Sequence, residues 1–119
     1  MFVVDLHSCP EFIAGDATRL RELLHPDKAD LQIRYSLAHA VVEPGRTSLR
    51  HRLATSEVYY ILQGTGTMHI DAKTAQVGQG QAVYIPPHCM QHIENTGAVD
   101  LVFLCIVDPA WRQQDEEVI

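Results

Sequence analysis

The feature that most constrains the fold is the close spacing of turn residues beyond Asp30. Glycine and proline residues recur along this part of the chain, and short β-rich runs lie between them. Many short β-rich segments between such turns are typical of a β-sandwich, jelly roll or barrel. The sequence therefore predicts an all-β fold, with strands at residues 31–42, 58–62, 67–71, 81–85, 91–95 and 101–107.

The first thirty residues predict a different kind of structure. Residues 1–6 are typical of a short strand, and Asp16 is a candidate N-cap for a short helix that carries Leu20, Leu23 and Leu24 on one face. His25-Pro26 ends that helix, because a residue before proline resists the helical conformation. We expect residues 1–30 to pack on a barrel formed by residues 31–107, and residues 108–119 to be a loosely held acidic tail.

The length and net charge of the chain limit the kinds of binding partner that we expect. The chain has 119 residues, enough for one domain, and nine basic against fifteen acidic residues give a net charge of −6. That balance gives no reason to expect nucleic-acid binding, and no apolar stretch has the length of a membrane span. The N-terminus has no signal-peptide pattern, and three scattered cysteines fit reduced thiols. We expect a cytoplasmic protein with a small-molecule ligand, and no nucleic-acid or membrane partner.

The segment 31–42 alternates in a way that predicts a half-buried strand. Its apolar face holds one polar side chain, His39, and one tyrosine, Tyr35. If the apolar face of this strand points inward, His39 lies inside the barrel. The alternative interpretation is a core histidine whose ring binds a backbone group. The other members of this face are Leu31, Ile33, Leu37 and Val41.

Two glycine-bounded segments, 44–66 and 80–97, carry most of the remaining polar residues of interest. The first places Gly45, His51, Glu57 and Gly64 at spacings that resemble the first motif of the cupin superfamily, and the second places Gly80, Pro86 and Asn95 like the second motif. The resemblance spans roughly residues 31–107 and implies a double-stranded β-helix, the jelly-roll barrel of that superfamily.

The resemblance also implies a metal site, which this chain retains only in part. In the family, the two motifs supply histidines and a glutamate to a divalent metal such as Mn, Fe, Ni, Co, Cu or Zn. Leu53 and Gln91 stand at two of the histidine positions, and His88 replaces the second motif's inner glycine. The predicted ligands are therefore His51, Glu57 and Gln91, with His39 as a substitute from a neighbouring strand. His92 would enter the site only if its strand slipped by one residue.

Three functions fit this pattern. A metal-dependent enzyme, for example a dioxygenase or isomerase, is the preferred hypothesis, and a non-catalytic ligand-binding or sensory barrel is the alternative. In either case Tyr35 and Tyr59 are candidates to contact the bound molecule. The third is a partner-binding role: residues 101–107 are apolar on both faces, and the resemblance implies a homodimer, since cupins of this size commonly dimerise. A buried Glu57 needs a cation, a charged histidine or its own protonation.

Overall fold

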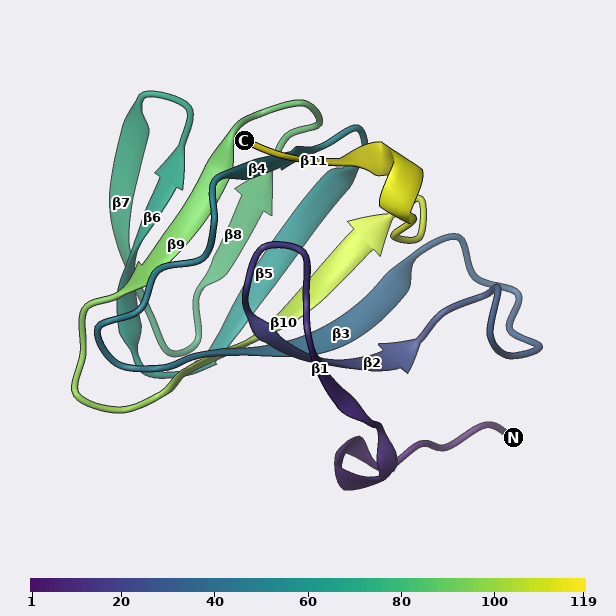
Figure 1. The fold of residues 1–119 in the computed structure, drawn as a ribbon. Coiled ribbons are helices and arrows are strands. Elements are labelled where there is room, and N and C mark those ends of the chain that lie inside the picture. Colours follow the sequence, from purple (N-terminus) through teal and green to yellow (C-terminus); the bar gives the residue numbers. More distant parts are fainter.

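The computed structural model describes all 119 residues as two antiparallel sheets packed face to face (Figure 1). The six-stranded sheet has the order β1-β2-β3-β10-β5-β8, and the five-stranded sheet has the order β11-β4-β9-β6-β7. The strands are β1 Glu11–Ile13, β2 Arg19–Leu24, β3 Ser36–Val42, β4 His51–Leu53, β5 Ser56–Gln63, β6 Thr65–Ile70, β7 Lys73–Gly78, β8 Ala82–Ile85, β9 Gln91–Asn95, β10 Leu101–Asp108 and β11 Glu116–Val118.

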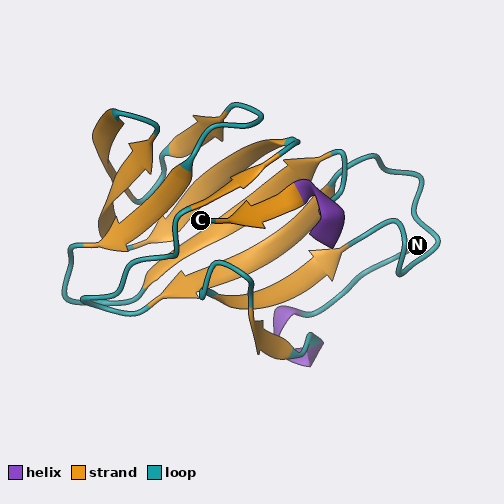
Figure 2. Ribbon diagram, turned by 45° about the horizontal axis from the view of Figure 1, so that its top comes forward, coloured by secondary structure: helices purple, strands orange, loops and turns teal.

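Strands dominate the structure, as Figure 2 shows, and the predicted all-β jelly roll is confirmed. Only two short 3-10 helical turns occur, η1 at Leu6–Ser8 and η2 at Gln113–Asp115. Strand β10 lies between β3 and β5, with Leu101, Phe103, Cys105 and Val107 buried between the sheets. The alternate residues of β10 are half-buried on the outer face, which is why this strand is apolar on both sides. No helix is long and apolar enough to cross a membrane.

The helix predicted after Asp16 is wrong, because Arg19–Leu24 is strand β2, paired between β1 and β3. Asp16 forms a turn instead of a helix cap: its side chain accepts hydrogen bonds from the Thr18 backbone N–H at 3.1 Å and hydroxyl at 2.7 Å. An aspartate at a turn and one at a helix start make the same kind of bond, so the local sequence does not separate them. This segment is a strand because it pairs with the edge of β3. Residues 1–6 are also not a strand.

The C-terminal segment is more ordered than the sequence predicts. Its last residues form β11, which pairs with β4 in the register Glu116↔Leu53, Glu117↔Arg52 and Val118↔His51. In Figure 1 the C-terminus lies beside β4 at the top of the molecule, whereas the N-terminal residues extend away from the sheets. The chain after β10 therefore closes one edge of the five-stranded sheet.

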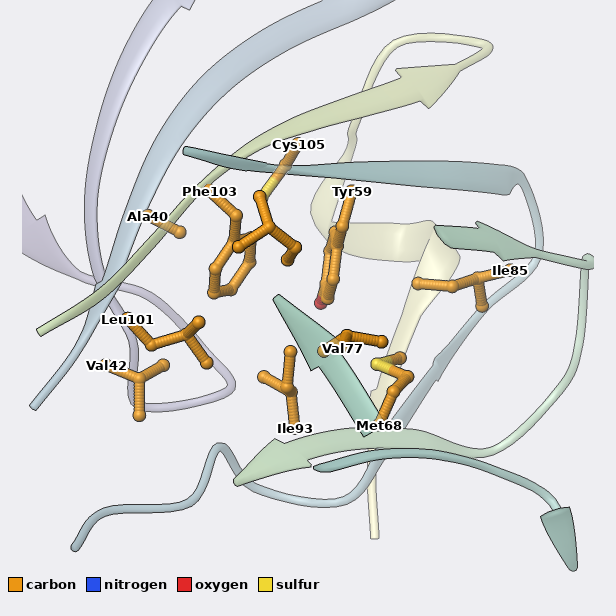
Figure 3. Packing of buried hydrophobic residues seen from close by; sticks show 11 residues of the cluster. Ala40, Val42, Tyr59, Met68, Val77, Ile85, Ile93, Leu101, Phe103 and Cys105 are labelled. Carbon is orange, nitrogen blue, oxygen red and sulfur yellow. The ribbon is translucent and has the colours of Figure 1, made fainter. Parts of the chain in front are cut away.

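Apolar side chains fill the space between the sheets at one end of the barrel (Figure 3). The rings of Tyr59 and Phe103 are tilted against each other with centroids 4.4 Å apart. Gly64, which ends β5 in the first motif, has a φ of +89°, and a Cβ there would lie 2.8 Å from the backbone oxygen of Asp100. This position therefore requires glycine. The motif's Asn95 is also structural, because its amide nitrogen donates to the backbone oxygens of Val42 and Val99 at 2.8 Å.

Candidate functional site

A cavity of about 370 Å³ opens between the sheets beside the apolar core, with which it shares Tyr59, Phe103 and Cys105. It lies among β3, β4, β5 and β10 and is bordered by the 14–18 turn and the C-terminal segment, which brings Trp111 and Glu116 to it. Its volume is within the range of small-molecule sites. The residues that carry chemistry in it are Asp16, His51, Glu57 and Glu116, beside apolar walls that include Leu53, Phe103 and Val107.

His51 is the first residue of β4 and is 2 % exposed. Its Nδ1 lies 2.7 Å from the backbone oxygen of Leu49, and because a carbonyl oxygen only accepts, Nδ1 is the protonated nitrogen. The other ring nitrogen, Nε2, lies 3.6 Å from Oδ2 of Asp16, which is longer than a hydrogen bond. His51 thus presents Nε2 to the cavity beside a carboxylate.

Glu57 lies on β5, faces the cavity and is 6 % exposed. One of its oxygens accepts a hydrogen bond from the Gln91 amide at 3.1 Å, and the other has no partner in the protein. The pKa of Glu57 is raised to about 8, chiefly by burial and to a smaller extent by the neighbouring carboxyls of Asp16 and Glu116, against the lowering effect of the Gln91 bond. Glu57 is therefore mostly a neutral acid at neutral pH, which answers how a glutamate is buried here without a cation.

Gln91 connects the two sheets behind Glu57. It pairs in register with His51, is 1 % exposed, and its oxygen accepts a hydrogen bond from the Tyr59 hydroxyl at 3.0 Å. Both ends of the amide are thus occupied, one by Tyr59 and one by Glu57. Gln91 holds the Glu57 carboxyl in place and does not itself line the cavity. Tyr59 lines the cavity, and burial raises the pKa of its hydroxyl well above 10, so it stays neutral.

Asp16 and Glu116 are the site residues that sequence reasoning missed. Asp16 is 9 % exposed and is held by Thr18, and Glu116 accepts a hydrogen bond from the Trp111 indole at 3.1 Å. The Glu116 carboxylate packs on Gly15, where any Cβ would overlap it. The Asp-x-Thr turn signal was visible in the sequence, but only the pairing of β11 with β4 brings Glu116 to the cavity.

Two predicted site residues lie elsewhere. His39 is on the outer face of the six-stranded sheet, where Arg21 and Leu104 are its cross-strand neighbours. Burial lowers the pKa of His39, with a smaller lowering from the charge of Arg21. The phase predicted for this strand was wrong, because β3 starts at Ser36 and turns Ser36, Ala38 and Ala40 inward. Tyr35 precedes that strand and is 40 % exposed, so it does not contact the cavity.

His92 also lies outside the cavity. Gln91 and Ile93 are buried, as the alternation of their strand predicts. The His92 ring points to the outer face and stacks on His69, with centroids 4.1 Å apart. No slip of register brings His92 inside.

The side chains present do not fit the divalent metal that the resemblance implies. No three histidine, cysteine, aspartate or glutamate side chains lie close enough together to hold one ion. Leu53 supplies no donor, His39 is on the other side of the sheet, and Gln91 does not line the cavity. Of the four predicted ligands, only His51 and Glu57 offer free donor atoms to the cavity.

The fold and the position of this cavity define a cupin barrel, and comparison with known families agrees. The cupin domain model matches residues 38–107, and the chain belongs to that family. An uncharacterized protein of Methanocaldococcus jannaschii is 40 % identical over 109 residues, which cover 91 % of this chain and 86 % of that protein.

Solved structures show the same fold. A predicted oxalate decarboxylase from Thermotoga maritima matches with a TM-score of 0.80 and 23 % identity, covering 91 % of this chain and 99 % of that one. The nucleoside dehydratase Pac13 of Streptomyces matches with a TM-score of 0.81 and 17 % identity, covering all of this chain and 91 % of that one. These neighbours differ widely in chemistry, so the fold alone does not choose a function.

Proposed function

We propose that this protein binds a small organic molecule in the barrel cavity and does so without a metal ion at His51 and Glu57. The observation that carries the proposal is the Glu57 carboxyl, which is 6 % exposed, fixed on one side by Gln91, and open to the cavity on the other. A ligand in the cavity can bond to the second carboxyl oxygen, which has no partner in the protein. His51 Nε2 offers a second free polar atom in the same cavity.

A screen of metabolites by thermal shift, on protein stripped of metals with a chelator, tests this proposal. A ligand at about 100 times its Kd stabilises the folded protein by about 2.7 kcal/mol, a shift of several degrees in Tm for a domain of this size. A matched pair of variants locates the site. Ala38→Leu fills the cavity and should abolish the shift, whereas His39→Leu places the same leucine on the outer face and should preserve it.

Stabilisation by transition metals, with no response to organic ligands, would contradict the proposal. Equal loss of the ligand shift in Ala38→Leu and His39→Leu would place the binding site outside the cavity. Tight binding that survives Ala38→Leu would do the same.

Proton-transfer catalysis on the same ligand is a second candidate function. It is favoured by a neutral carboxylic acid, Glu57, that faces the same cavity as a histidine nitrogen, His51 Nε2. Such a pair can give a proton to one atom of a substrate and accept one from another. Mass spectrometry of the identified ligand after incubation in D2O tests this: deuterium uptake that Glu57→Gln removes supports catalysis, and no uptake leaves binding as the function.

The homodimer implied by the family remains a prediction. The outer face of the six-stranded sheet supports it, since Tyr60, Leu62 and Tyr84 are 41 %, 38 % and 62 % exposed there. Sedimentation equilibrium at micromolar concentration distinguishes a dimer from a monomer, and a clean monomer would contradict the prediction.

A further inference from the structure

We infer that the ligand of this cavity is an organic cation, an ammonium group on an apolar skeleton, and not an anion. This inference rests on the proposed binding function and adds the charge class of the ligand. Its basis is the set of charged side chains that surround the cavity and the position of their free atoms.

Carboxyl groups dominate the cavity. Asp16, Glu22, Glu57 and Glu116 line it, against one lysine, Lys28, and no arginine. Lys28 is bound to Glu22 at 2.6 Å and its side chain is 66 % exposed, so this pair contributes little net charge at the mouth. Arg52 does not enter the cavity, since it faces outward on β4 beside Glu117. An anion would therefore meet carboxylates and find only His51 to pair with.

Three of the carboxyls converge from distant parts of the chain. Asp16 comes from the turn before β2, Glu57 from β5 and Glu116 from β11. Asp16 and Glu116 both act electrostatically on Glu57, and Glu116 rests against Gly15, the neighbour of Asp16. Like charges this close are costly unless something positive lies among them or one is protonated.

Two buried side chains aim free polar atoms into the cavity, which makes it more than an acidic surface. Glu57 is 6 % exposed with one oxygen unpartnered, and His51 is 2 % exposed with Nε2 unbonded. No three acidic, histidine or cysteine side chains lie close enough together to hold one metal ion, whereas an ammonium on a carbon skeleton can reach Glu57 and still fill a 370 Å³ cavity. The apolar walls, among them Phe103, Val107 and Leu53, suit that skeleton.

Release of a proton from Glu57 on binding would distinguish a cationic ligand from a neutral or anionic one. Without ligand, Glu57 is mostly protonated at pH 7, because its pKa is about 8. A cation beside it favours the ionised form, so binding should release most of one proton per site. The other acidic groups that face Glu57 in the cavity wall, the Tyr59 hydroxyl and the Cys105 thiol, stay neutral because burial raises the pKa of both.

Matched fragment series test the charge class directly. Each series has one skeleton and three head groups, for example cyclohexylmethylamine, cyclohexanemethanol and cyclohexanecarboxylate, with a second series on an indole skeleton. Titration calorimetry at pH 7 should show the amine binding about tenfold or more tighter than the carboxylate, since a nearby opposite charge shifts a carboxyl pKa by about one unit or more. Repeating the titration in two buffers of different ionisation enthalpy should reveal the released proton.

A pair of variants assigns the effect to Glu57. Glu57→Gln should cut amine affinity about tenfold or more and abolish proton release. Glu117→Gln, the same change on the outer face of β11, should alter neither. Proton release that persists in Glu57→Gln would overturn the assignment.

The outcomes separate the two proposals. Alcohols or carboxylates that bind as well as the amines, and lose binding in Ala38→Leu, would overturn the cation inference and leave the binding function standing. Failure of every member of both series to bind at millimolar concentration would count against both.

Discussion

The central strands β5 and β10 border the apolar core along one half of their length and the cavity along the other half. The Leu101 end of β10 packs in the apolar core and its Val107 end faces the cavity, while Phe103 and Cys105 between them belong to both. Strand β5 does the same, with Ile61 in the core and Glu57 in the cavity. One half of each strand thus packs apolar side chains in the core. The other half borders the cavity, where polar atoms such as those of Glu57 are exposed to it. The first half serves stability and the second accepts a cost in stability to keep a site open.

Substituting Glu57 should give the largest effect, a gain in stability. Because the pKa of Glu57 in the folded protein is about 8, above its ordinary value of 4.5, the folded state holds a proton that the unfolded chain releases between these pH values. The stability that this proton provides is complete below pH 4.5 and is lost as the pH rises to 8. Glu57→Gln mimics the neutral acid and should exceed the wild type by about 4 kcal/mol at pH 8, and match it near pH 4.

Urea unfolding of both proteins at several pH values measures this difference. The wild type should lose about 1.4 kcal/mol per pH unit between these limits relative to the variant. Parallel curves for the two proteins would mean that Glu57 does not keep its proton. Glu117→Gln is the control, since that residue pairs with Arg52 on the outer face.

A substitution in the apolar half should give the opposite sign. Ile93 is fully buried in the core, and Ile93→Ala should destabilise the protein by about 2–5 kcal/mol through lost burial and a new cavity. Ala38→Leu, which adds bulk to the existing cavity, should change the free energy of unfolding by less than about 1.5 kcal/mol. Urea titrations of both compare the two halves, and a similar cost for both variants would show that the cavity half is as tightly packed as the core.

The His88 position should give a smaller gain. His88 has a φ of +68°, in the left-handed region that favours glycine, and the cupin motif has a glycine there. His88→Gly should therefore relieve strain and stabilise the protein by about 1 kcal/mol. The residue is exposed, so ligand binding should not change. A loss of stability in thermal unfolding would mean that the histidine ring contributes more than its backbone costs.

The smallest expected effect is on metal binding, where we expect almost none. After loading with Mn, Fe, Ni, Co, Cu or Zn and desalting, the protein should retain less than about a tenth of an equivalent, because Leu53 and the bonded Gln91 leave too few donors. Elemental analysis measures this. His39→Ala should not change the result, since His39 lies on the outer face. A full equivalent of bound metal in the wild type would contradict our description of the site.

The parts of the site that local spacing predicts are those that lie at positions of the two cupin motifs. His51, Glu57 and Gln91 occupy motif positions, and all three are buried between the sheets. The phase of β3 was not predictable in this way, since it carries apolar residues on both faces: Ala40 and Val42 inside, Leu37 and Val41 outside. Alternation then has two solutions, and the sequence pattern favoured the wrong one for His39.

The remaining features of the site depend on pairing between strands that are far apart in the sequence. Asp16 and Glu116 reach the cavity because β2 pairs with β3 and β11 with β4, and neither pairing leaves a mark in the local sequence. Because of this pairing, the segment expected to be a helix is strand β2, and part of the tail expected to be loosely held is strand β11. Sequence separations of this size are beyond what periodicity can detect.

The protonation of Glu57 is the measurement that tests this account most directly. Carbon-13 NMR of protein labelled at glutamate side-chain carboxyls, assigned by comparison with Glu57→Gln, follows that carboxyl as pH is raised. We expect a midpoint near pH 8 in the ligand-free protein, falling toward the ordinary range when a bound ammonium compound lies beside it. A midpoint near 4.5 without ligand would show that the carboxyl is hydrated or paired, and would contradict the claim that Glu57 is a neutral acid in the ligand-free protein.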